Sequence, residues 1–281
     1  MTLLLGMSKA EGIYMSTDYR VTNARSGTLI DDSAIKFLTV HYPPDGAGPK
    51  VLFGYTGVAI LRDGTPTGQW LRETLRGVSE SFDDSMAHLR ERLDRDVTPM
   101  RVGLIINVLV LQGERRFAGG FTNLEKSDRS SLKLKKSFSY SLQELTEPFV
   151  FVNGSGGVQV LADRHLDLVR SQLGVRPRKP MDHMNLLAQV NRRVAALNQT
   201  VSPYCHVAFV NADDTTSPTS HAFVEGIESV PFDMPFLLFG LDLSDEFRGL
   251  MERSQEFFKT GKPMPESDSV EEINKRIQRR P

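Results

Sequence analysis

The sequence predicts a layered α/β fold in which antiparallel sheets carry helices on their outer faces. Strand-like segments occur in three runs, and two pairs of helix-like segments separate these runs. Helices grouped in pairs favour antiparallel sheets, because alternating βαβ units would place one helix after each strand. A composition of 40% apolar and 25% charged residues is typical of a globular chain that buries a core without disulfide or metal cross-links.

The first run of strands fills the N-terminal part of the chain. Residues 3–5 and 13–17 flank a glycine-bearing turn and predict a hairpin. Further strand-like segments are residues 28–30, 36–41 and 51–56, and a loop rich in proline and glycine separates the last two. The sequence therefore begins in a sheet.

The two helix pairs and the later strands follow in a regular order. Apolar residues recur at helical spacing among charges at 69–76 and 85–93. The next predicted strands are 101–111, 115–122, 132–139 and 149–152. The second helix pair is predicted at 158–173 and 181–197, before a closing hairpin of 205–210 with 221–225.

The charge balance argues against a nucleic-acid partner. The chain has 34 Lys and Arg against 35 Asp and Glu, for a formal net charge of −1. Binding to a phosphate backbone requires a concentrated basic face, and the densest basic stretch is the short segment Lys133–Lys136. We interpret this segment as a solvated strand edge.

Membrane, metal and disulfide chemistry are also not expected. The longest apolar run, Leu104–Leu111, is far shorter than the roughly 18 residues of a membrane-spanning helix. No basic region precedes residues 3–5, so we do not expect a signal peptide. A single cysteine, Cys205, excludes a disulfide framework, and the six histidines are scattered. We therefore expect a soluble cytoplasmic protein without membrane partner, metal site or cofactor.

Five short motifs occur in an order that is typical of one enzyme group. They are Thr2 after the initiator Met, the segment Thr17–Thr22 with its acidic-x-Arg-x-Thr pattern, the lysine segment Ser33–Phe37, the glycine turn Gly54–Ala59 and the glycine-rich loop Asn153–Gly157. In this combination the chain resembles the proteasome-type N-terminal nucleophile (Ntn) hydrolases, the group of proteasome β subunits and their bacterial relatives. The resemblance covers about residues 2–225 and implies a four-layer αββα sandwich of two antiparallel sheets flanked by helices.

The resemblance implies that Thr2 is the nucleophile, exposed at the chain's N-terminus by removal of Met1. A threonine hydroxyl needs a base, and a free α-amino group, whose pKa is ordinarily about 7.7 to 8, can take its proton. Only an N-terminal threonine carries both groups. Taken alone, Thr2 would simply be the second residue of an edge strand.

Lys36 and Asp18 are expected to form a buried ion pair beside Thr2. The charge of Lys36 would lower the pKa values of the Thr2 hydroxyl and amine, and a buried lysine needs a carboxylate partner. Ile35 and Phe37 alternate with Lys36, which places Lys36 on the opposite face of the strand. A Lys36 that faces solvent remains the alternative.

The resemblance assigns four further residues to the site. The backbone N–H of Gly57 would stabilise the oxyanion, a role that suits glycine because the substrate carbonyl must approach the main chain. An ordinary strand-ending turn is the alternative for Gly57. Ser155 would assist the amine and the attacking water, while Arg20 and Thr22 would line a cleft in which substrates pair as extended strands.

One position departs from the family pattern. The family usually places an aspartate in the loop before the strand at 205–210, and this sequence has Asn198 there. An asparagine accepts hydrogen bonds but cannot stabilise the ammonium form of an amine by charge. Either other groups set the pKa of the Thr2 amine, or the protein is a slow or inactive enzyme.

We therefore expect a threonine-type peptidase that cleaves polypeptides through an acyl-enzyme on Thr2. The alternatives are a catalytically inactive structural or regulatory subunit and an Ntn amidase that acts on a small molecule. By analogy the resemblance implies a homo-oligomer, and it leaves open an unfoldase or regulatory partner.

The C-terminal part of the chain lies beyond the resemblance. Residues 232–239 are largely apolar, a helix is predicted at 244–259, and the end is charged. Such apolar residues are better suited to packing on the sandwich or on another subunit than to exposure to water. The sequence thus predicts a hydrolase domain at 1–225 and an extension at 226–281.

Overall fold

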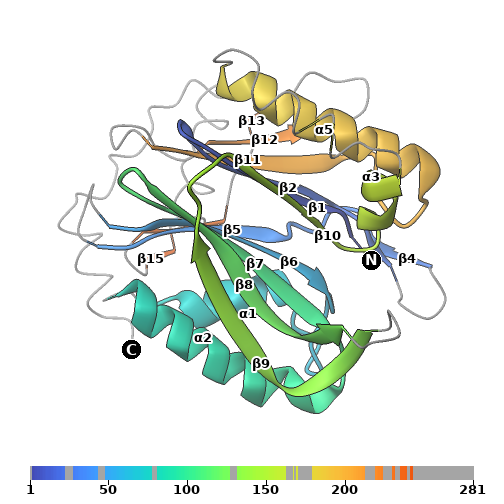
Figure 1. Ribbon diagram of the computed structural model, residues 1–281. Coiled ribbons are helices and arrows are strands. Elements are labelled where there is room, and N and C mark those ends of the chain that lie inside the picture. Colours follow the sequence, from blue (N-terminus) through green and yellow to red (C-terminus); the bar gives the residue numbers. More distant parts are fainter. Residues whose placement is uncertain are drawn as a thin grey trace, which may run out of the picture.

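Two sheets lie face to face, and helices cover both outer faces (Figure 1). The structure is a computed structural model. It describes residues 2–22, 28–43, 48–77, 81–126, 132–162, 167, 169, 179–212, 219–223, 230–231, 235–238 and 241–242. The predicted α/β layering is therefore present in this part of the chain.

The first sheet has six strands in the order β10-β1-β2-β11-β12-β13. Their bounds are β1 Leu4–Lys9, β2 Gly12–Asp18, β10 Phe149–Asn153, β11 Cys205–Asn211, β12 Thr219–Phe223 and β13 Val230–Pro231. All pairs are antiparallel, and β1 and β2 form the predicted N-terminal hairpin, with Leu4 opposite Thr17. This register places Asp18 at the end of β2, next to the N-terminal end of β1.

The second sheet has seven strands in the order β15-β14-β5-β6-β7-β8-β9. Their bounds are β5 Phe37–His41, β6 Lys50–Gly57, β7 Leu104–Gln112, β8 Arg115–Lys126, β9 Leu132–Glu144, β14 Phe236–Leu238 and β15 Leu241–Asp242. The expectation of purely antiparallel sheets was wrong for one pair, since β14 runs parallel to β5. A parallel neighbour requires a long connection, and here β14 arrives from far along the chain.

Four α-helices form the outer layers of the described structure. Below the second sheet lie α1 (Thr67–Leu75) and α2 (Phe82–Asp96), followed by a short 3₁₀ turn at Thr98–Met100 (Figure 1). Above the first sheet lie α3 (Gly157–Ala162) and α5 (Pro180–Leu197). The helix predicted at 158–173 begins as expected, and most of its second half lies outside the described residues. Within the described ranges, no helix is long and apolar enough to cross a membrane.

Three apolar clusters hold the layers together. One joins α1 and α2 to the second sheet around Trp70 and Leu89, and another joins α5 to the first sheet around Leu187. The third lies between the sheets and includes Leu4 and Leu52. Helix α5 illustrates the origin of this packing, because its buried residues recur at helical spacing along one face.

Short strands complete both sheets and the rim of the sandwich. β3 (Val21–Thr22) pairs with β4 (Leu29–Asp31) in a separate two-stranded ribbon. The strands beyond residue 225 join the main sheets, with β13 next to β12 and with β14 next to β5. The division into two regions at residue 225 stays a prediction, and the helix predicted at 244–259 lies outside the described residues.

Candidate active site

Lys36 is the centre of a buried polar cluster at one end of the sandwich. It immediately precedes β5 and is 2% exposed. Its ammonium donates to Thr2 Oγ1, to Asp18 Oδ1 at 3.1 Å and to the carbonyl oxygen of Arg20 at 2.5 Å. Three residues that the sequence assigns to one site therefore meet at the Nζ atom of Lys36.

Asp18 connects this cluster to three backbone segments. Its fully buried carboxylate accepts from the backbone N–H of Leu3 at 2.8 Å through Oδ1. Oδ2 accepts from the N–H groups of Arg20 at 3.0 Å and Ser202 at 3.1 Å. Both oxygens are thus fully used, which fixes the position of the carboxylate against Lys36.

Burial and charge act in opposite directions on Lys36. Burial lowers the pKa of Lys36, because the ammonium form loses hydration, and the negative charge of Asp18 opposes that shift. Asp32 and Asp31 add smaller effects in the same direction as Asp18. The arrangement places a poorly hydrated cationic group directly beside a threonine hydroxyl.

The loop after β10 packs tightly against the main chain of Thr2. Gly154 adopts a φ of +92°, and a Cβ atom there would lie 2.0 Å from the carbonyl oxygen of Thr2. The backbone N–H of Gly156 donates to the same oxygen at 3.3 Å, and Ser155 Oγ lies 3.5 Å from it. Only glycine fits at position 154, and this close approach brings the Ser155 hydroxyl to Thr2.

Asn198 reaches this loop through a residue that the sequence did not single out. Its Oδ1 accepts from Thr200 N at 3.0 Å and Thr200 Oγ1 at 2.6 Å, and its Nδ2 donates to Gln159 Oε1 at 3.2 Å. Thr200 Oγ1 in turn lies 3.2 Å from Ser155 Oγ. Among the described residues, Asn198 is therefore connected to Thr2 through Thr200 and Ser155, and no direct hydrogen bond joins them.

Arg20 connects two loops through its side chain, and its role in lining a substrate cleft stays a prediction. Its guanidinium donates to both carboxylate oxygens of Asp32, at 3.2 and 2.7 Å, and to the carbonyl oxygen of Gln199 at 2.8 Å. Hydrogen bonding to Asp32 raises the pKa of Arg20. Thr22 is buried in β3, next to the ribbon partner β4. The bidentate pair with Asp32 was not predicted, because no local pattern links positions twelve residues apart in a loop.

Gly57 lies at the end of β6, as the motif predicts. It has a φ of +115°, and a Cβ atom there would lie 2.2 Å from the carbonyl oxygen of Gly103. The next N–H, that of Val58, donates to this oxygen at 3.1 Å. This geometry alone explains a glycine at the strand end, so a role in binding an oxyanion stays a prediction.

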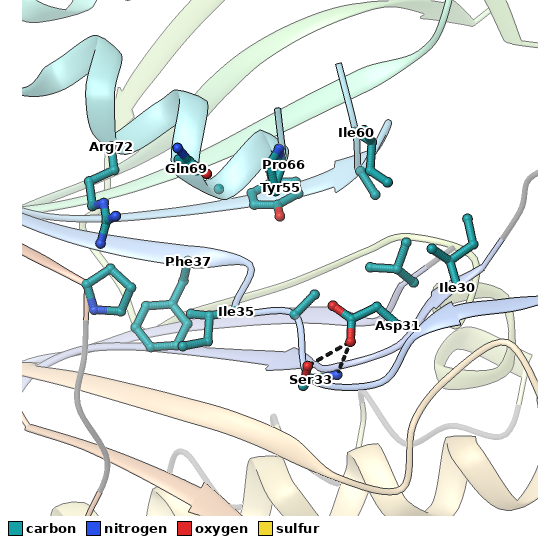
Figure 2. A pocket seen from close by; sticks show the side chains of 15 residues that line it. Ile30, Asp31, Ser33, Ile35, Phe37, Tyr55, Ile60, Pro66, Gln69 and Arg72 are labelled. Carbon is teal, nitrogen blue, oxygen red and sulfur yellow. Dashed lines mark hydrogen bonds between the residues drawn. The ribbon is translucent and has the colours of Figure 1, made fainter. Parts of the chain in front are cut away.

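A cavity of about 330 Å³ lies beside the segment that carries Lys36 (Figure 2). Its walls include residues 33–35 and Phe37, residues of α1, and Pro235. Most of the lining is apolar, and its large apolar residues include Ile30, Ile35, Phe37, Tyr55, Ile60 and Pro66. Asp31 and Arg72 are its charged residues, and Arg72 Nε is paired with Asp242 Oδ2 at 3.2 Å. The cavity was not predicted, because its walls come from segments that are distant in the sequence.

The described residues contain no group of three or more His, Cys, Asp or Glu side chains arranged to hold a metal ion. Cys205 is buried in β11, and burial raises the pKa of its thiol to about 12. The polar groups that meet at the site are those of Thr2, Lys36 and Asp18.

Comparisons with known proteins identify the fold. No family model matches the sequence, and no curated protein is similar to it. The Anbu complex from Pseudomonas aeruginosa, solved as a helical assembly, is similar in structure, with a TM-score of 0.51 and 12% identity over 94% of this chain and 98% of that chain.

Two further Anbu structures have lower scores. Anbu (ancestral β-subunit) from Yersinia bercovieri has a TM-score of 0.48 and 13% identity over 95% of this chain and 99% of that chain. An Anbu (Gly-1) mutant from Hyphomicrobium sp. strain MC1 has a TM-score of 0.47 and 12% identity over 92% and 100%. At such identities the likeness concerns the fold alone. The predicted resemblance is thus confirmed at the level of the fold: this chain is similar to Anbu, a proteasome-like Ntn hydrolase.

Proposed function

We propose that the protein is a threonine-type Ntn hydrolase that cleaves peptide bonds with Thr2 as nucleophile. The observation that carries the proposal is the buried Lys36 ammonium, which contacts both Thr2 Oγ1 and Asp18. A cation in this position stabilises the developing alkoxide of a threonine and favours the neutral form of a nearby amine.

The proposed reaction begins once Thr2 is the N-terminal residue. Thr2 Oγ1 attacks the carbonyl carbon of the scissile peptide bond while the Thr2 amine takes the hydroxyl proton. The C–N bond breaks, the proton passes to the leaving amine, and an ester on Thr2 remains. Water then attacks this ester with the same amine as base, which releases the acid product and restores the hydroxyl. The Gly57 N–H would stabilise the oxyanion in both steps.

We infer that an apolar side chain of the substrate enters the cavity beside Lys36. The cavity is lined mainly by apolar residues, and Ile35 and Phe37, the two sequence neighbours of Lys36, are part of its wall. The β3–β4 ribbon, with Thr22, borders the same region and can pair with an extended polypeptide. We thus propose polypeptides with a large apolar residue at the cleavage site as substrates.

Self-association is the second part of the proposal. The Anbu complex from Pseudomonas aeruginosa is a helical assembly, and this chain shares its fold. The outer helices carry two large apolar side chains that face solvent, since Leu161 on α3 is 60% exposed and Leu197 on α5 is 62% exposed. Sedimentation velocity tests this part: a single species at the monomer mass, 31.4 kDa, at micromolar concentration would contradict it.

A catalytically inactive subunit of the same fold is the second candidate. It is favoured by Asn198, because an amide supplies no negative charge near the amine. In this case the polar cluster around Lys36 would stabilise the fold and take no part in catalysis.

Mass spectrometry and an acylating probe decide between the two candidates. Intact mass shows whether Thr2 is the N-terminal residue of the purified protein. A peptide β-lactone, which acylates an activated threonine hydroxyl, should form one adduct, and peptide mapping should place it on Thr2. Hydrolysis of apolar fluorogenic peptides should be lost in the Thr2→Ala variant. Equal turnover by Thr2→Ala, or a retained Met1 together with no adduct, would refute the proposed activity.

A further inference from the structure

The hydrogen bonds around Thr200 have a direction that can be assigned atom by atom. A backbone N–H can only donate, so the contact of Thr200 N with Asn198 Oδ1 at 3.0 Å identifies this atom as the amide oxygen. The oxygen cannot donate, so Thr200 Oγ1, 2.6 Å from it, must donate its hydrogen. The bond from Asn198 Nδ2 to Gln159 Oε1 agrees with this orientation of the amide.

The direction of the next bond follows from the first. A hydroxyl has one hydrogen, and that of Thr200 is used on Asn198. Ser155 Oγ lies 3.2 Å from Thr200 Oγ1, so in this contact Ser155 is the donor and Thr200 the acceptor. The alternative acceptor for Ser155, the carbonyl oxygen of Thr2, is farther away at 3.5 Å. Ser155 therefore directs its hydrogen to Thr200, which leaves the lone pairs of its Oγ free to accept another hydrogen bond.

We propose that Thr200 is a positioning residue, which turns Ser155 into a hydrogen-bond acceptor for the Thr2 amine through the neutral chain Asn198–Thr200–Ser155. The inference rests on the proposed function, since it concerns the amine that acts as base. An acceptor at Ser155 binds an N–H of the amine and leaves the nitrogen lone pair free to face Thr2 Oγ1. A donor at Ser155 would instead bind that lone pair and block the base.

The proposal predicts a specific effect on the amine. If Thr200 loses its hydroxyl, Ser155 can donate to the amine nitrogen, which stabilises the neutral amine and lowers its pKa. The charged groups that face Thr2 in the described residues are Lys36, before β5, and Asp18, at the end of β2. Farther from Thr2, the guanidinium of Arg20 is paired with Asp32 at 2.7 Å. None of these changes when Thr200 is replaced, so a shift can be assigned to the hydroxyl chain.

The test compares Thr200→Val, which removes the hydroxyl at nearly constant shape, with Thr200→Ser, which keeps it. Thr74→Val is the matched control, because Thr74 is a buried threonine of α1 whose hydroxyl has no hydrogen-bond partner among the described residues. Each full-length protein is assayed for kcat, KM and the pH profile of kcat/KM with an apolar peptide amide. Adduct formation with a peptide β-lactone and thermal unfolding are measured in parallel.

We expect Thr200→Val to lower kcat by roughly tenfold, the scale of one hydrogen bond lost from the transition state, with KM unchanged. The acidic limb of the pH profile should move to lower pH in this variant. Thr200→Ser should restore both properties, and Thr74→Val should match the wild type. The role of Thr200 would be overturned by a wild-type pH profile for Thr200→Val, or by a Thr200→Ser variant as poor as Thr200→Val. In either case, lactone adducts on Thr2 would still support the proposed function. A wild-type protein that forms no adduct and shows no turnover overturns both.

Discussion

Replacing Asp18 by asparagine is expected to destabilise the fold by about 3 to 5 kcal/mol. The carboxylate is fully buried and lies 3.1 Å from the ammonium of Lys36, which is itself 2% exposed. The amide has the same shape but no charge, so the variant retains a buried ammonium without its counter-ion. Removing one member of such a pair costs far more than removing an exposed one.

The contacts of Asp18 support a loss of this size. An asparagine at this position must point its NH₂ group either at the N–H groups of Arg20 and Ser202 or at Leu3 N and Lys36, and two donors lose their acceptor in either case. Each such loss costs about 1 to 3 kcal/mol. The cost of leaving the Lys36 charge unpaired has an upper limit, because Lys36 can release its proton instead. For a lysine with an ordinary pKa near 10.4, that release costs about 4.6 kcal/mol at pH 7.

Urea unfolding followed by tryptophan fluorescence measures this loss. The chain has a single tryptophan, Trp70, which is 4% exposed in α1 and therefore reports on unfolding. Glu144→Gln is the control, because the Arg115–Glu144 pair has a similar distance of 2.9 Å but exposed side chains. The control should unfold at the wild-type urea concentration. A loss below about 1 kcal/mol for Asp18→Asn, which is the range of exposed pairs, would refute the reasoning.

Three further predictions concern acid stability, the glycine loop and the cavity. Burial lowers the pKa of His206 from 6.5 to about 3, so the folded state binds fewer protons than the unfolded state in this range, and stability should fall as the pH drops from 6.5 towards 3. His206→Gln should flatten this fall in urea midpoints, and an unchanged slope would contradict the assignment. Gly154→Ala would force a Cβ against Thr2 O, so we expect a loss of at least about 1 to 3 kcal/mol and no lactone adduct. If Gly154→Ala is acylated by the lactone as readily as the wild type, the loop can accommodate a Cβ atom and the prediction is wrong. Asp242→Asn removes the partner of Arg72 and makes the cavity more positive by one charge. The ratio of kcat/KM for peptides with Glu to that for peptides with Leu at the cleavage site should then rise. A constant ratio would show that the cavity does not bind this substrate side chain.

The order of the layers could be predicted because it depends on local periodicity. The alternation around the turn at Gly12 gave the β1–β2 hairpin, and the apolar stripe of α5 gave a helix with bounds close to 181–197. The parallel strand β14 was missed, because nothing within Phe236–Leu238 indicates which edge it joins or in which direction. Partner choice between distant strands is a property of the whole sheet and not of the segment.

The candidate site was predicted in part, for the same physical reason. Thr2, Asp18 and Lys36 each belong to a short motif, and the structure brings them together. Thr200 carries no such motif, and its contact with Ser155 forms only when the loop after α5 folds against the loop after β10. The role of Arg20 as a clamp on Asp32 likewise depends on a turn that closes in three dimensions.

The parallel pairing of β14 with β5 also has a consequence for the time at which the site can form. β5 follows directly on Lys36. It pairs with β6 on one side and on the other with β14, which the ribosome makes long after β5. Contacts between such distant segments form slowly and late in folding. A nascent chain would therefore carry Thr2 and Asp18 long before the strand behind Lys36 is closed on both edges. With the proposed function, this delay would leave the active site incomplete while the rest of the protein's own chain is still unfolded and open to cleavage.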